Sequence, residues 1–208
     1  ENPNGYNRRG GLYMEQKRYP EAEADFNKAI ACDSTYLLSY FNRALVYSDT
    51  NRPMQALSDF DKVIQLDSMN SLTYFNRAML RTQIGDYNRA LDDYDKVALY
   101  SPNNVLVYYN RAGVYFQLGE LEKAVEDYTS AIDLYPDFAN AYIYRSRLRE
   151  LLRDQQGAKK DRDTAQKKIA EYRSRLSDST YSIFADTTQR FDRLLSFDSK
   201  FSGGSFDR

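Results

Sequence analysis

A period of 34 residues runs through most of the sequence and limits the folds open to it. The tetrad Tyr-Phe-Asn-Arg at 40–43 recurs at 74–77, and Tyr-Tyr-Asn-Arg follows at 108–111, with the same offset of 34 residues. A pair of short helices of this length cannot bury an apolar face alone, so such repeats must stack on one another. Five repeats follow without a gap: 3–36, 37–70, 71–104, 105–138 and 139–172.

Each repeat has the periodicity of two amphipathic helices, which predicts an all-α fold. In repeat 71–104, apolar residues recur at helical spacing on both sides of Gly85-Asp86, which interrupts the pattern. Two positions in every repeat hold a small residue, and we expect the paired helices to cross closely there. The small residues are Gly10, Ala44, Ala78, Ala112 and Ser146 in the first helix, and Ala22, Ala56, Ala90, Ala124 and Ala158 in the second.

The sequence resembles the tetratricopeptide repeat family in this period, in the small residues at positions eight and twenty, and in the aromatic residue at position 24. Asn-Arg-Ala tripeptides at 42–44, 76–78 and 110–112 give the repeats a bacterial style. The resemblance implies a right-handed α-solenoid of five helix pairs, in which the first helix of each pair lines a concave groove. Arg162 replaces the aromatic residue in the fifth repeat, as expected for a terminal repeat.

We divide the chain into a repeat array over 1–176 and a C-terminal extension over 177–208. The array includes a capping continuation of its last helix to Leu176, and the extension carries a short predicted helix over 187–196 and an aromatic tail. The extension is either a cap with the start of a downstream segment, or a segment that occupies a groove. Self-association through the extension is therefore possible. Because the sequence begins at Glu1 without Met, we expect it to be part of a longer protein.

An arginine at position seven and an aspartate at position 23 occur in all five repeats. A charge beside a core stripe needs a partner, so we predict a partly buried ion pair in every repeat. The sequence leaves open whether the pairs form within or between repeats. We expect them to fix the register of the stack, and the alternative is that the arginines bind a ligand. The central pairs are formed by Arg43, Asp59, Arg77, Asp93, Arg111 and Asp127.

Family geometry implies that positions two, five and six of each repeat face the concave groove. These residues are Leu38, Leu72, Leu106, Phe41, Phe75, Tyr109, Asn42, Asn76 and Asn110. An Asn side chain offers both a donor and an acceptor, so a row of them could bind the backbone of an extended peptide. The alternative is that these asparagines only keep a solvent-exposed surface polar. Gly11 and Gly113 at position nine leave space for a ligand or reflect sequence drift.

Composition excludes several kinds of function. Lys plus Arg number 29 and Asp plus Glu number 30, which argues against a nucleic-acid binder or a polybasic membrane anchor. The absence of His removes His-based catalysis and metal ligation. Cys32 alone cannot form an internal disulfide, and we expect it to be a small core residue. There is no apolar run long enough for a membrane span and no phosphate-binding loop. We expect no metal and no cofactor.

The sequence therefore predicts a non-enzymatic protein-interaction module that binds a peptide or protein segment in its concave groove. The alternative is a scaffold or oligomerisation domain of a larger protein that uses its tail, ends or convex face. A third hypothesis is a regulatory domain attached to an enzyme. We expect the chain to be soluble, in the cytoplasm or periplasm, although the sequence does not decide the compartment.

Overall fold

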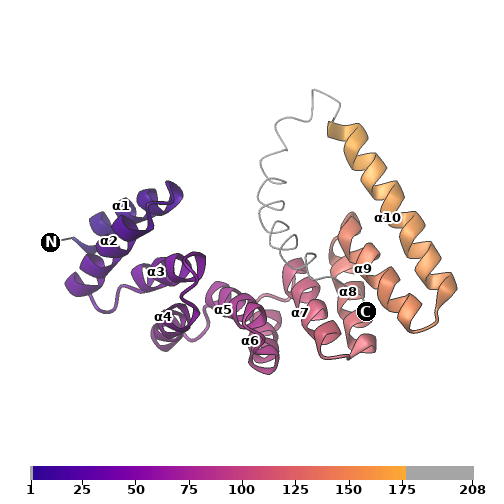
Figure 1. Cartoon of the computed structure of the whole chain (residues 1–208), viewed down its shortest axis with the longest axis horizontal. Helices are drawn as coiled ribbons and strands as arrows, with labels where there is room; N and C mark the ends of the chain where they lie inside the picture. Colours follow the sequence, from indigo (N-terminus) through magenta and orange to yellow (C-terminus); the bar gives the residue numbers. More distant parts are fainter. Residues whose placement is uncertain (1, 177–208) are drawn as a thin grey trace.

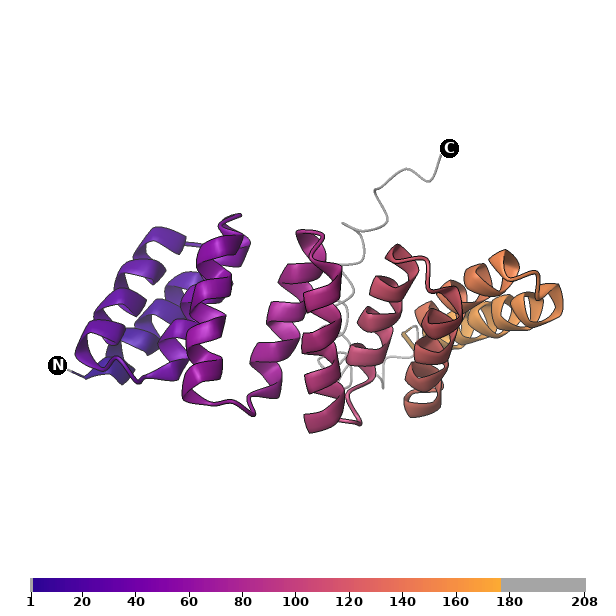
Figure 2. The ribbon, with the colours of Figure 1, turned by 90° about the horizontal axis from the view of Figure 1, so that it is seen from below.

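The computed structural model describes residues 2–176, which form ten consecutive α-helices (Figure 1). The helices are α1 (Pro3–Glu15), α2 (Tyr19–Cys32), α3 (Leu37–Asp49), α4 (Pro53–Leu66), α5 (Ser71–Gln83), α6 (Tyr87–Tyr100), α7 (Val105–Gln117), α8 (Leu121–Leu134), α9 (Ala139–Leu151) and α10 (Gln155–Leu176). They form five pairs that match the five repeats, and Figure 2 shows the pairs standing side by side along an α-solenoid.

The turn inside each pair has the same backbone conformation in all five repeats. Its fifteenth residue has a positive φ, which allows the second helix to fold back on the first. These residues are Lys17 (59°), Asn51 (57°), Gly85 (79°), Gly119 (76°) and Arg153 (64°). A side chain in this region costs about 1 kcal/mol or more, so glycine suits the turn in the third and fourth repeats.

The small residues lie where the two helices of a pair approach each other. Ala44 and Ala56 of the second repeat have no exposed surface. At Gly10, an added Cβ atom would lie 2.6 Å from Cε1 of the buried Phe26 side chain in α2. The small residues therefore let the aromatic ring of the second helix pack directly on the backbone of the first.

Neighbouring repeats share their cores. Val107 and Val114 of α7 pack in one cluster with Tyr94 and Val97 of α6, and Leu80 of α5 packs in the cluster of the preceding repeat. The first helices also contact one another, α1 with α3 and α5 with α7. The first helices therefore line one side of the solenoid, as the resemblance implies.

Two expectations need a correction or a limit. Cys32 is exposed at the end of α2, so its prediction as a core residue was wrong. It lies in the last helical turn, where the chain leaves the buried stripe for the next repeat. The predicted short helix at 187–196 and the aromatic tail lie outside the described residues. Within the described part, no helix is long and apolar enough to cross a membrane.

Candidate functional site

The arginine and aspartate of each repeat form a two-pronged ion pair between its two helices. In the second repeat, Arg43 Nε donates to Asp59 Oδ2 and Nη2 donates to Oδ1, both at 2.7 Å. The partners lie 16 residues apart in the sequence, and the same arrangement joins Arg77 to Asp93 and Arg111 to Asp127. The carboxylates are buried, so the pairs of the second to fifth repeats are charge-assisted contacts largely shielded from water.

The third donor of the same guanidinium reaches backwards to the preceding repeat. The acceptors form a column at position 25 of each repeat, 16 residues before each arginine. These contacts are Arg43 Nη1 to Asn27 (2.5 Å), Arg77 Nη1 to Asp61 (2.5 Å), Arg111 Nη1 to Asp95 (2.7 Å) and Arg145 Nη1 to Thr129 (2.9 Å). Each of these four arginines therefore contacts three helices that belong to two neighbouring repeats.

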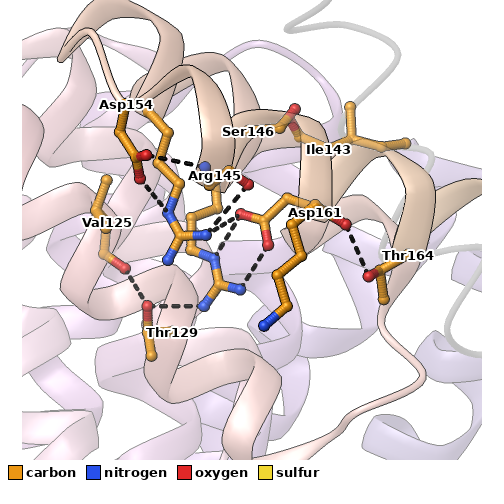
Figure 3. Close-up of polar contacts among 11 residues, drawn as sticks. Val125, Thr129, Ile143, Arg145, Ser146, Asp154, Asp161 and Thr164 are labelled. Atoms are coloured by element: carbon orange, nitrogen blue, oxygen red, sulfur yellow. Dashed lines mark hydrogen bonds and ion pairs between the residues drawn. The ribbon is translucent and has the colours of Figure 1, made fainter.

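Figure 3 shows this arrangement in the fifth repeat, where Arg145 lies between Asp161 and Thr129. A second arginine, Arg149, also donates to Asp161, at 3.0 Å. In the third repeat Arg81 contacts Asp93 in the same way, at 2.7 Å. Tyrosine rings at position four lie 5.5–5.7 Å from the position-seven guanidinium in all five repeats, within the range of a cation–π contact.

Sequence analysis missed the acceptors at position 25. The signal was present, because the column at 27, 61, 95 and 129 is polar in each of these repeats and directly follows the buried aromatic residue at position 24. A search for polar residues that recur at the 34-residue period beside the core stripe would have found them.

The first two repeats are joined by a further ion pair. Arg52 at the start of α4 donates to Glu23 Oε2 of α2 at 2.7 Å. This hydrogen bond lowers the pKa of the Glu23 carboxyl. The hydrogen bonds from Arg9 likewise lower the pKa of Asp25 below its ordinary value. Both carboxyls are therefore held in the charged form by the arginines of the folded array.

The leucines predicted to face the groove are placed at the start of the first helices. Leu38 is 48% exposed and Leu72 is 61% exposed, whereas Leu106 is half-buried. The aromatic residues are less accessible than expected. Phe75 and Tyr109 are each only 6% exposed, because their rings pack against the position-24 aromatics Tyr94 and Tyr128 in an edge-to-face arrangement.

The three asparagines are partly exposed. Asn76 Nδ2 donates to the carbonyl of Leu72, and Asn110 Nδ2 donates to the carbonyl of Leu106, both at 2.8 Å. Asn42 instead donates to Asn7 Oδ1 of the first repeat at 3.1 Å. The second and third amides of the row are therefore oriented alike, and the first is turned towards its neighbour in α1.

The two glycines at position nine of the groove, Gly11 and Gly113, have open space around them. A Cβ atom added at Gly11 or Gly113 would have no neighbour within 4 Å, so no packing contact requires glycine there. Among residues 2–176, no group of three or more His, Cys, Asp or Glu side chains is placed to hold a metal ion.

Solved structures of other proteins have the same architecture. MamA from Desulfovibrio magneticus RS-1 superposes with a TM-score of 0.76 at 16% identity, over 81% of this chain and 96% of that chain. PilF from Pseudomonas aeruginosa superposes with a TM-score of 0.70 at 18% identity, over 97% and 93%. YrrB, described as a TPR protein with an unusual peptide-binding site, gives 0.69 at 16% identity, over 88% and 90%.

At these identities the structural likeness shows the fold. A comparison with curated protein sequences gave no significant match. Sequence profiles are informative: the tetratricopeptide repeat profile matches residues 3–36 and 105–138, and two further profiles of the same repeat match 26–58 and 79–119. With the 34-residue period and the five stacked helix pairs, these matches identify the chain as a member of the tetratricopeptide repeat family.

Proposed function

We propose that this protein binds an extended segment of a partner protein along the side formed by the first helices. The repeat fold and its structural neighbours support a protein-interaction module in general. The observation that carries the more specific proposal is the row of asparagine amides in α3, α5 and α7, which recurs at the repeat period beside exposed leucines.

The orientation of the amides supports main-chain recognition. Asn76 and Asn110 each use one amide hydrogen on a helix carbonyl, which fixes the side chain. The second amide hydrogen and the amide oxygen can then serve a ligand. Packed helices lie about 10 Å apart, which is about three residues of an extended chain at ~3.3 Å per residue. The amides of Asn76 and Asn110 can therefore engage peptide groups about three residues apart.

The apolar residues supply the contact area for side chains of the ligand. Leu38 and Leu72 are the exposed anchors, and the buried rings of Phe75 and Tyr109 form the support beneath the surface. Gly11 and Gly113 place no side chain on the surface at the two ends of the row. This arrangement favours a peptide with apolar residues and without a strong charge requirement. YrrB, a structural neighbour, is described as having a peptide-binding site, which agrees with this use of the fold.

Selection of peptides from a random library on the full chain tests the proposal. The triple variant Asn42→Ala, Asn76→Ala and Asn110→Ala should bind the selected peptides more weakly, by about fivefold for each lost amide contact. Asn88→Ala, which changes an exposed asparagine of α6, is the matched control and should bind as the unchanged protein does. Alanine favours helix, so circular dichroism should show that all variants remain folded. Equal affinity of the triple variant would reject the asparagine row as the binding site.

A further inference from the structure

The contact between the first helices of the first and second repeats buries polar side chains. Asn7 of α1 is 8% exposed, and Ser39 of α3 has no exposed surface. Position five, where the first repeat has Asn7, is aromatic or aliphatic in the other repeats. Those residues are Phe41, Phe75, Tyr109 and Ile143. Between the third and fourth repeats, for example, Phe75 packs in one cluster with Val107. The groove therefore has a polar subsite between α1 and α3, formed by Asn7, Gly11, Ser39 and Asn42.

The Asn7 side chain is held through its oxygen, and its amide nitrogen remains available. Ser39 Oγ and Asn42 Nδ2 both donate to Asn7 Oδ1, each at 3.1 Å. These two bonds use both lone pairs of the oxygen. Within residues 2–176, no hydrogen bond uses Asn7 Nδ2. Because more than nine-tenths of the side chain is buried, this donor lies in the protein surface without an acceptor from the described chain.

Gly11 leaves open space beside these amides. It lies one helical turn after Asn7 on the same face of α1, and an added Cβ atom would have no neighbour within 4 Å. Gly113, at the same position of the fourth repeat, has equally open surroundings although it has a repeat on either side. The open space is therefore a property of position nine and does not depend on what precedes α1. The second repeat has Leu45 at this position.

The hydrogen-bonding groups around this space are complementary to a primary carboxamide. Asn7 Nδ2 is a donor, and Asn42 retains its oxygen and its second amide hydrogen after donating to Asn7. A carboxamide has an oxygen that accepts and a nitrogen that donates. An ionised carboxylate only accepts, and an aliphatic side chain would leave the Asn7 donor unpaired.

We propose that the partner segment places an Asn or Gln side chain in this subsite. Its carbonyl oxygen accepts from Asn7 Nδ2, and its amide nitrogen donates to Asn42 Oδ1. The inference rests on the proposed function, because it gives the chemistry of one residue of the segment bound along the first helices. Packed helices lie about 10 Å apart, so this residue lies about four or five positions of an extended chain from the peptide group that Asn76 engages.

Peptides selected from a random library on the full chain test this inference. Their aligned sequences should share an Asn or Gln at one position. Replacing that residue by an apolar residue of similar size, Leu for Asn or Met for Gln, should weaken binding by about fivefold, because a buried donor then loses its acceptor. Replacement by the matching acid should weaken binding at least as much, since a carboxylate cannot donate to Asn42.

Two variants of the protein locate the preference. Gly11→Leu fills the open space and should reduce the preference for the carboxamide peptide to less than about twofold. Gly113→Leu makes the same change at the other end of the row and should keep the full preference. Because leucine favours helix more than glycine does, circular dichroism should show both variants folded.

A second variant converts the subsite to the apolar type of the later repeats. Asn7→Leu combined with Ser39→Val removes the amide together with the hydroxyl that donates to it, so neither group is left buried without its partner. This variant should bind the apolar peptide more tightly than the carboxamide peptide, which reverses the preference of the unchanged protein.

The inference is overturned if the selected peptides share no Asn or Gln, if the apolar peptide binds equally well, or if Gly11→Leu keeps the preference. Tighter binding of the acidic peptide would also overturn it and would indicate Arg8, the cation that follows Asn7 in α1. The Asn76→Ala and Asn110→Ala double variant leaves the polar subsite unchanged and tests the proposed function separately. Loss of affinity in that variant without a carboxamide preference would reject the subsite alone, whereas a chain that selects no peptide would reject both proposals.

Discussion

The first and fifth repeats contain the same ion pair in different surroundings. Arg145 lies between Asp161 and Thr129, and its side chain is 10% exposed. Arg9 makes the same two hydrogen bonds to Asp25 but remains half in solvent. The difference arises because the guanidinium is covered by the preceding repeat and not by its own. A repeat therefore supplies the carboxylate, and its neighbour supplies the burial.

The two ends also differ in what they present to a further repeat. The last helix has cations at the stacking positions, with Lys159 and Arg162, and continues to Leu176. The first repeat keeps the aliphatic residue of an internal repeat at Leu12. The fifth repeat thus has cations at positions where internal repeats have apolar residues, and the first repeat keeps the aliphatic residue that internal repeats bury.

The largest effect should come from removing the aspartate at the two ends. Asp161→Ala leaves the guanidinium of Arg145 buried without its carboxylate, and we expect a loss of about 3–5 kcal/mol in unfolding free energy. Asp25→Ala should cost clearly less, because water can hydrate the exposed Arg9. Urea unfolding followed by circular dichroism measures both variants.

The corresponding asparagine variants, Asp161→Asn and Asp25→Asn, keep the size of the side chain and control for packing. Asp93→Ala in the third repeat should resemble Asp161→Ala, since Arg77 and Arg81 both depend on that carboxylate. Equal losses at Asp25 and Asp161 would show that burial by the preceding repeat does not set the strength of the pair.

Low pH should reduce the stability of the first repeat, because Asp25 and Glu23 become protonated. Their pKa values are lower in the folded protein than in the unfolded chain. Each therefore contributes stability above its unfolded pKa, about 3.9 for Asp and 4.3 for Glu, and this contribution is lost as pH falls through the folded value. Thermal melting should show that Asp25→Asn lowers the midpoint at pH 7 and that this difference shrinks as the pH falls below about 4. A constant difference across this range would contradict the assignment.

The positive-φ turns of the first and fifth repeats should respond equally to substitution by glycine. Lys17 and Arg153 have positive φ values of 59° and 64°, a conformation that costs a side chain about 1 kcal/mol or more. Lys17→Gly and Arg153→Gly should each stabilise the protein by about 0.5–1 kcal/mol, measured by urea unfolding. Gly85→Ala is the reverse control. An added Cβ there meets no atom within 4 Å, so only its φ of 79° opposes the substitution.

Equal gains at the two ends would show that the turn is a local property of each repeat. A gain at Lys17 alone would instead indicate that the long helix α10 constrains the last turn through its own packing.

The 34-residue period predicted the helices well because the same pattern of residues occurs in every repeat. The small residues, the aromatic at position 24 and the Arg-Asp pair recur in every repeat or nearly so, and their physical requirements agree. The exposure of Cys32 could not be predicted in this way, because it depends on where the helix ends relative to the next repeat. The burial of Phe75 and Tyr109 depends on rings of the second helix that lie 19 residues later in sequence.

The candidate site was harder to predict than the fold. The sequence placed asparagines and leucines in columns, but it did not give the turn of Asn42 towards Asn7 or the hydrogen bonds of Asn76 and Asn110 to helix carbonyls. Side-chain direction depends on the distance between neighbouring first helices. The contrast between Arg9 and Arg145 likewise depends on which repeat lies next to each arginine, and a pattern shared by all repeats contains no such information.

The smallest effect should be the response of peptide binding to salt, which separates the neutral asparagine row from the charged arginine column. The asparagine row recognises a ligand through neutral amides, so peptide binding should change by less than about twofold between 50 and 500 mM sodium chloride. A weakening of more than about threefold over the same range would show that the charged arginine column takes part in ligand binding, and the description of the groove as neutral would then be wrong.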